Sequence, residues 1–444
     1  MTRSGGHRTR VLGCAAALSL GWAIAPAAAD TAAGDADVAS LRTQVQDLQR
    51  EVAQLRRTDD QHWLDQRRAE DVKALIREVL ADADTRASLL QDAVLAGYDN
   101  GFFLKSADGN YLLKIMGQIQ FRYNADFRDN SGSDDSNSGF ELARTRFGFK
   151  GHVIDPSWQY FIWTGYGANG NDLLLDAWIK KDFGQGLSLT AGQFKVPFWR
   201  EWLISETRLQ AVERSLINNV FGCNYTQGLT LGYQNDALRG QFSVNDGASS
   251  RVSTWNTPDS DYALTARGEW LATGTWKQAD ELEAWAGDDP LVMLGGAVLY
   301  QHGEEGTLDD ETDTVRWTAD VTAKWNGLSL LAAVLGSHAD NGDSVDQFAA
   351  LLQAGFFVTE KLELFARYEW GDLDTEDDDD LSILTVGGNY FFRKHAVKLS
   401  ADVGYGFNPV TAGWTGTSGI TGWQADSPDE DGQVLVRTQL QLLF

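Results

Sequence analysis

Lysine and arginine residues recur at polar positions of alternating segments, and their chemistry is the binding of anions. The positions are Lys114, Arg122, Arg144, Arg146, Lys150, Arg367 and Arg437. Alternate residues of an extended strand point to opposite faces, so these cations would share the polar faces of their strands. Rings of Lys or Arg favour the passage of anions, and guanidinium groups hold phosphate oxygens in pairs. The same charges could instead pair across neighbouring strands and hold a sheet together, and the sequence leaves this alternative open.

The segments that would position these cations read as a β-barrel. From Tyr111 onward the chain forms roughly sixteen alternating runs, each near the ~9–11 residues that a tilted strand needs to cross a bilayer. Short connections such as Ile154–Pro156 alternate with long ones such as 408–432, as periplasmic turns and external loops do. The connection 272–290 is long for the turn side. A propeller would show a blade-length repeat, which is absent, and a soluble sandwich is the remaining rival. We predict an all-β membrane protein, an antiparallel outer-membrane β-barrel of about 16 strands over residues 98–444.

The final segment, Val434–Phe444, alternates apolar with polar residues. Its even positions would face lipid, and Arg437, Gln439 and Gln441 would face the channel. We expect this segment to close the barrel by pairing with the strand that starts near Tyr111, so that no open edge remains.

The N-terminal part is predicted to be a signal peptide followed by helices. Residues 1–29 combine a basic start, an apolar core and small residues before a cleavage site, which is typical of a bacterial secretory signal. Residues 30–97 would form a periplasmic helical segment, with a short coiled coil where apolar residues keep heptad spacing from Val38 to Leu55. A single amphipathic helix packed on a domain is the alternative for that stretch. A second helix is expected from about His62 to Leu95, followed by a hairpin turn at Asp108-Gly109.

The composition excludes several classes of function. The net charge of −26 argues against nucleic acid as a partner. Once the signal peptide is removed, Cys223 is the sole cysteine, which leaves no internal disulfide and no cysteine metal cluster. The histidines are scattered without the spacing of a catalytic or metal site. The sequence therefore predicts no enzyme activity, no metal and no cofactor.

Three motifs resemble one known family. They are FFLKSADGNYLLKIMGQIQFRY at the start of the barrel, FELARTRFGFKG in the second strand, and AGQFKVPF followed by ERSLIN after the fifth. Together they resemble the phosphate-selective porin O and P family, in particular its coiled-coil-bearing members, and the likeness covers residues 98–444. The resemblance implies a sixteen-stranded, usually trimeric outer-membrane channel for small anions.

The resemblance also assigns roles to particular residues. In this family the segment after AGQFK folds back into the lumen, which here would be Lys195 to Asn219. Its candidate pore-lining cations would be Lys195, Arg200, Arg208 and Arg214. An external loop whose charges face solvent is the alternative. The terminal Phe444 looks like the family's signal for the barrel assembly machinery.

The function expected from the sequence is passive diffusion of small hydrophilic solutes through an outer-membrane porin. Anions such as phosphate would be weakly preferred, because acidic outer loops such as Asp377–Asp380 and Asp429–Asp431 repel polyanions near the mouth. The expected partners are outer-membrane lipid, two further copies in a homotrimer and the barrel assembly machinery. The alternative is a structural outer-membrane anchor whose coiled coil links the barrel to the cell wall.

Overall fold

The structure is a computed structural model of the whole chain, and parts of the chain are described in it. The described residues are 33–58, 72–78, 94–99, 101–128, 136–166, 172–255, 260–304, 311–340, 344–375, 380–416, 419–426 and 432–444. The predicted signal peptide, residues 1–29, lies outside them. The chain divides into two compact units, Met1–Ser88 and Leu89–Phe444, and each is considered by itself.

The first unit contains a single long helix among its described residues. Helix α1 spans Ala33–Thr58, and residues 72–78 are also helical. Leu41, Val45 and Val52 of the heptad seam are less exposed than the residues around them, whereas Leu48 of the same seam is 50% exposed. The pairing of this helix in a coiled coil stays a prediction. Among the described residues, none of the helices combines the length and apolar character needed to cross a membrane.

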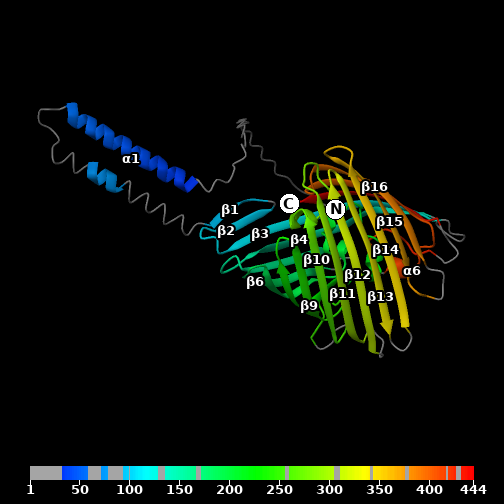
Figure 1. Cartoon of the computed structure of the whole chain (residues 1–444). Coiled ribbons are helices and arrows are strands. Elements are labelled where there is room, and N and C mark those ends of the chain that lie inside the picture. Colours follow the sequence, from blue (N-terminus) through cyan, green and yellow to red (C-terminus); the bar gives the residue numbers. More distant parts are fainter. Residues whose placement is uncertain are drawn as a thin grey trace, which may run out of the picture. The chain divides into compact units, whose positions relative to one another are not determined.

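The second unit is one antiparallel sheet of 18 strands (Figure 1). The strands are β1 (Val94–Tyr98), β2 (Phe102–Ser106), β3 (Leu112–Phe127), β4 (Ser136–His152), β5 (Trp158–Tyr166), β6 (Asp172–Gly184), β7 (Leu187–Lys195), β8 (Tyr225–Gln234), β9 (Leu238–Asn245), β10 (Tyr262–Thr273), β11 (Leu291–Glu304), β12 (Glu311–Trp325), β13 (Leu328–Asp340), β14 (Ser344–Phe357), β15 (Leu362–Asp372), β16 (Leu381–Arg393), β17 (Val397–Gly406) and β18 (Val434–Leu443). From β3 onward each strand pairs with the next, and β18 pairs with β3, which closes a 16-stranded barrel. The predicted antiparallel barrel of about 16 strands is confirmed.

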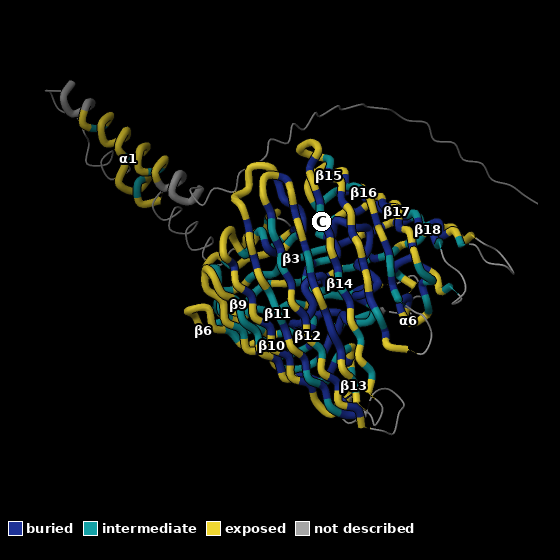
Figure 2. Tube along the Cα trace, turned by 45° about the vertical axis from the view of Figure 1, so that its right-hand side comes forward, coloured by how far each residue is buried: buried dark blue, intermediate teal, exposed yellow. Residues whose placement is uncertain are grey.

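Side chains alternate between the two faces of the wall. In β18, Arg437, Gln439 and Gln441 are buried inside the barrel, whereas Leu440 and Leu442 are exposed on the outside. Figure 2 shows the same alternation of buried and exposed residues along neighbouring strands. The predicted assignment of apolar residues to the outer face is therefore confirmed, because a lipid-facing wall needs apolar side chains outside and leaves polar ones to the lumen.

The two ends of the barrel have different connections. Short connections such as 185–186 and 326–327 lie at one end, here called the turn end. Longer ones such as 196–224 and 407–433 start from the other end, here called the loop end. The short helices all lie in connections: α3 (Arg200–Leu203), η1 (Glu206–Arg208), α4 (Ile217–Phe221), α5 (Trp276–Ala279) and α6 (Ala412–Thr415).

A hairpin of β1 and β2 precedes the barrel. The turn predicted at Asp108-Gly109 joins β2 to β3 and is confirmed: Gly109 adopts a φ of +76°, and Ser106 donates its backbone N–H to the carbonyl of Tyr111 over 3.0 Å. The predicted helix from His62 to Leu95 is wrong at its end, because Val94 already pairs with Ser106 in the hairpin.

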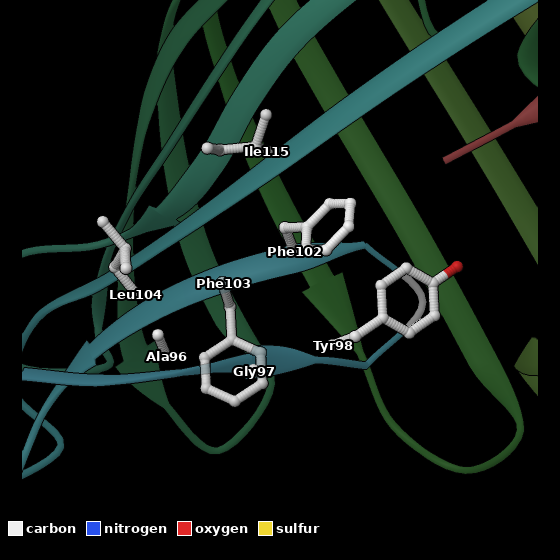
Figure 3. A pocket seen from close by; sticks show the side chains of 7 residues that line it. All are labelled: Ala96, Gly97, Tyr98, Phe102, Phe103, Leu104 and Ile115. Carbon is white, nitrogen blue, oxygen red and sulfur yellow. The ribbon is translucent and has the colours of Figure 1, made fainter. Parts of the chain in front are cut away.

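The difference arises because Val94–Tyr98 pairs with β2 along its whole length. The Phe103 ring lies over its cross-strand partner Gly97, where a Cβ would stand 2.8 Å from the ring (Figure 3). The hairpin lines a shallow apolar pocket. Its lining residues are Ala96, Gly97, Tyr98, Phe102, Phe103, Leu104 and Ile115.

The chain end completes the seam between β18 and β3. Phe444 donates its N–H to the carbonyl of Gly117 over 3.1 Å and accepts the N–H of Gly117 at 2.8 Å. The Phe444 ring covers Gly117, where a Cβ would lie 2.2 Å from it. Nearer the start of β3, residues Leu112–Ile115 of the same edge pair with β2. This edge of β3 is therefore occupied along its length.

Deletion of Phe444 should lower the amount of folded barrel in the outer membrane several-fold. The deletion removes both hydrogen bonds to Gly117 and the proposed assembly signal, whereas Phe444→Tyr keeps the hydrogen bonds and the aromatic ring. The measurement is the fraction of heat-modifiable protein in outer-membrane preparations. Single-channel conductance of the molecules that do insert should be unchanged. Equal folded fractions for the deletion and for Phe444→Tyr would contradict the assignment.

Candidate constriction site

The connection between β7 and β8, residues 196–224, lies inside the barrel. Gln210 donates to Ser329 Oγ of β13 over 2.7 Å, and the backbone N–H of Val212 donates to Asp402 Oδ2 of β17 over 2.8 Å. Gln120 of β3 donates to the carbonyl of Glu206 over 3.3 Å. One segment can reach these separate strands only from within the lumen. This is the inward folding that the resemblance implies, and the alternative of an external loop is wrong for this segment.

The sequence of this connection drives it inward. Strand β7 ends at Lys195, and Pro197, two residues later, has no N–H with which to continue the hydrogen-bonded ladder. Val196, Phe198 and Trp199 are fully buried. They join an apolar cluster in the lumen with residues of the wall and of the β17–β18 connection. The wall and β17–β18 members include Leu299, Leu331, Leu351, Val410, Trp414 and Trp423.

Glutamates of the inward segment neutralise guanidinium groups of the wall. Glu213 pairs with Arg144 over 2.7 Å and with Arg122 over 2.8 Å. Glu206 pairs with Arg146, also of β4. The partners in the first two pairs are at least nine-tenths buried. Charges removed from water in this way need opposite charges or hydrogen bonds, and each of these groups has one.

A second group of pairs continues around the wall. Glu201 of the inward segment lies 3.3 Å from Arg367, which also contacts the carboxylate of Glu369 at 2.9 Å. Arg437 holds Asp402 through two hydrogen bonds of 2.8 and 2.9 Å. The sequence left open that the wall cations form ion pairs that hold the sheet together. Part of the wall is built in this way.

The predicted cations within the inward segment are held mostly by backbone carbonyls. Lys195 donates to the carbonyl of Trp202 over 2.8 Å, and Arg214 stacks over the Trp202 ring at 4.6 Å. Arg200 donates to the carbonyl of Ala279. Arg208 is half-buried and reaches the carbonyl of Asp280 at 3.3 Å.

The remaining two predicted cations lie towards the turn end. Lys150 is exposed at the inner end of β4, and Lys114 contacts Asp99 of the hairpin at 3.0 Å. Lys150 is close enough to Lys114 and to Arg208 for each of these charges to repel its own. These cations are thus separate from the buried pairs of Glu206 and Glu213.

Sequence reasoning selected the cations of the inward segment and missed its carboxylates. Glu201, Glu206 and Glu213 alternate with the predicted cations in the stretch REWLISETRLQAVERS. The nearly equal numbers of acidic and basic residues in this stretch could have indicated these carboxylates. A segment buried in a lumen lined by cations needs anionic side chains to pair with them.

A second connection also folds inward. The capping box of Thr275 and Gln278 starts α5, and Lys324 of β12 donates to three carbonyls of the connection 274–290. Lys324 Nζ lies 2.6, 2.7 and 2.8 Å from the carbonyl oxygens of Gln278, Glu281 and Glu283. Leu282 joins the lumenal apolar cluster. The excess length that disagreed with a simple turn is explained by this inward fold.

The β17–β18 connection narrows the loop end. Trp414 and Trp423 are buried, and Arg122 donates to the carbonyl of Ile420 over 2.6 Å. The acidic outer stretches predicted at Asp377–Asp380 and Asp429–Asp431 lie almost wholly outside the described residues.

Comparison with known proteins agrees with this architecture. Residues 114–288 match the family described as "Phosphate-selective porin O and P". The resemblance seen in the sequence is thereby confirmed over these residues. No curated protein matches the chain significantly.

Several solved structures share the fold. The anion-selective porin from Comamonas acidovorans has 13% identity, covers 75% of this chain and 99% of its own, and gives a TM-score of 0.55. The outer membrane channel DcaP of Acinetobacter baumannii has 14% identity, with 79% and 100% coverage and a TM-score of 0.52. OmpT of Vibrio cholerae, in a trimer form, has 13% identity, with 75% and 99% coverage and a TM-score of 0.51. The fold is that of bacterial outer-membrane porins.

Glu213→Gln should lower the stability of the barrel markedly. The substitution leaves Arg122 and Arg144 buried without their shared carboxylate, and breaking a buried pair in this way costs about 3–5 kcal/mol. The measurement is the thermal unfolding midpoint of the detergent-solubilised protein, and the midpoint should fall.

Glu141→Gln is the matched control. Glu141 is 28% exposed and lies 3.4 Å from the same Arg122. Removing its charge should change stability by less than about 1 kcal/mol. Equal midpoints for the two variants would contradict the dominant role of Glu213.

Proposed function

We propose that the protein is a passive channel for small hydrophilic solutes with a weak preference for anions such as phosphate. The observation that carries the preference is the group of Lys114, Lys150 and Arg208 towards the turn end. Lys150 is close enough to each of the other two cations for their charges to repel its own, and Lys150 is exposed. Within the described part of the chain, Lys150 and Arg208 form no ion pair with a carboxylate. An anion passing this point would meet cations that are not already neutralised.

The preference should be weak because the rest of the lumen is nearly compensated. Glu206 and Glu213 occupy the guanidinium groups of Arg122, Arg144 and Arg146. A solute can bind these groups only by displacing a carboxylate that is already hydrogen-bonded to them. The strong negative charge of the whole chain acts in the same direction.

The selectivity is testable in planar bilayers with asymmetric potassium chloride. The wild-type protein should give discrete conductance steps and a small reversal potential of the sign for anion preference. The double variant Lys150→Glu, Arg208→Glu should move the reversal potential towards cations, because it replaces accessible positive charges without breaking a buried pair. Lys105→Glu, on the exposed side of the hairpin, is the control and should leave the potential unchanged. Absence of conductance steps would contradict the channel, and a cation-selective wild type would contradict the anion preference.

We also propose that the protein is a homotrimer assembled in part by helix α1. The heptad spacing of Leu41, Val45 and Val52 supports this assembly, since such a seam is buried when helices associate. The comparison with OmpT in a trimer form supports a trimeric barrel only by analogy.

Removal of residues 30–88 should lower the fraction of trimer and leave single-channel conductance unchanged. The measurement is the oligomer distribution in mild detergent, by size-exclusion chromatography with light scattering. Trimers that persist at the same fraction would contradict assembly by the helices and favour the alternative role, in which they tether the barrel to the cell wall.

A further inference from the structure

Two acidic side chains and one histidine converge at the turn end of the barrel. Glu281 and Glu283 belong to the inward connection 274–290, and His395 lies in the turn between β16 and β17. His395 Nε2 lies 2.8 Å from Glu281 Oε2 and 3.6 Å from Glu283 Oε2. One potential ligand atom from each residue lies within 4.8 Å of the other two.

The carboxylate of Glu283 is buried without a hydrogen-bond partner among the described residues. It is 1% exposed, and within the described part of the chain neither of its oxygens accepts a hydrogen bond. Its nearest cationic atoms are His395 Nε2 at 3.6 Å and Lys398 Nζ at 3.8 Å. Buried charges in proteins are paired with an opposite charge or coordinate a metal. The cationic atoms nearest to Glu283 lie too far away to form hydrogen bonds with it.

We propose that Glu281, Glu283 and His395 bind a divalent transition-metal ion of the Zn²⁺ type. Bonds of about 2.0–2.2 Å in a tetrahedral site place neighbouring ligand atoms about 3.4 Å apart. The observed separations of 2.8 and 3.6 Å lie on either side of that value. One imidazole nitrogen with two carboxylate oxygens suits Zn²⁺ better than Mg²⁺ or Ca²⁺, which prefer sites built of oxygen alone. The fourth position would be taken by water.

Surrounding residues hold Glu281 and His395 in place. Trp285 Nε1 donates to Glu281 Oε1 over 3.1 Å, which leaves Oε2 directed at His395. Gln441 donates to the carbonyl of His395 over 2.7 Å. The rings of Trp285 and Phe391 stand edge-on to the imidazole, with centroids 5.6 and 5.8 Å away. Ligands fixed by such contacts lose little freedom when an ion binds.

Two lysines lie nearby, and both already have hydrogen-bond acceptors. Lys324 Nζ is held by three backbone carbonyls of the connection, and Lys398 Nζ donates to the carbonyl of Leu209 over 2.7 Å. Lys398 approaches Glu283 on its Oε1 side, so Oε2 stays directed at His395.

An ion could reach this site and would link two parts of the barrel. The side chains of His395 and Glu281 are 12% and 17% exposed. Because two ligands come from the inward connection and one from the wall, binding would fasten that connection to the β16–β17 turn.

The test is zinc titration of the full-length, chelator-stripped protein in detergent, by calorimetry and by thermal unfolding. The wild type should bind one Zn²⁺ per chain at this site and unfold at a higher temperature with it, and Mg²⁺ should do neither. His395→Gln and Glu283→Gln should each weaken this binding at least ~tenfold. Gln at position 395 can still donate to Glu281, and Gln at position 283 removes a charge that accepts no hydrogen bond, so both variants should fold.

His338→Gln is the matched control. His338 pairs with Asp346 over 2.8 Å, and within the described residues no third ligand joins that pair. This variant should bind Zn²⁺ as the wild type does. Absence of zinc binding by the wild type, or equal binding by the wild type and Glu283→Gln, would overturn the proposal. Heat-modifiability of each variant confirms that it is folded, and if His395→Gln fails to fold, Glu283→Gln alone decides.

Discussion

The interior depends on one electrostatic constraint: guanidinium groups of the wall are removed from water and must be paired. Arg122 and Arg144 lie on adjacent strands and share Glu213, which a segment folded into the lumen supplies. Once that segment is inside, its backbone amides and carbonyls need partners too, and wall side chains provide them. The backbone N–H of Val212 donates to Asp402, and the carbonyl of Leu209 accepts from Lys398. The inward segment and the wall are therefore stabilised by the same contacts.

Apolar packing adds to this constraint from inside the lumen. Trp199 of one inward segment, Leu282 of another and Trp414 of the β17–β18 connection share one buried cluster. The inner face of the barrel wall is otherwise polar. This apolar cluster gives the three connections a common core. Arg200 then joins two of them directly through the carbonyl of Ala279.

The sequence predicts the wall better than it predicts what fills it. A period of two in hydrophobicity is a local property, so β18 and its exposed and buried faces could be derived from Val434–Phe444 alone. The pairing of Arg122 with Glu213 could not, because it joins residues far apart in the chain and depends on the path of the connection between β7 and β8. Strand β1 was missed because Val94 and Leu95 continue the apolar spacing of the preceding helical stretch, and only the partner strand distinguishes the two structures. The length of the connection 272–290 correctly indicated that it is not a simple turn. Only the structure shows that it folds into the lumen.

The alternation of the wall has a consequence for how such chains diverge. On the outer face, Leu440 and Leu442 are exposed, so one apolar residue can replace another there at little energetic penalty. On the inner face, a change at Arg437 must be matched by a change at Asp402, because the two are coupled. Half of each strand is thus free to drift while the other half can change only in concert. Barrels of this architecture can then share a backbone at 13% identity with a porin from another bacterium, as this chain does.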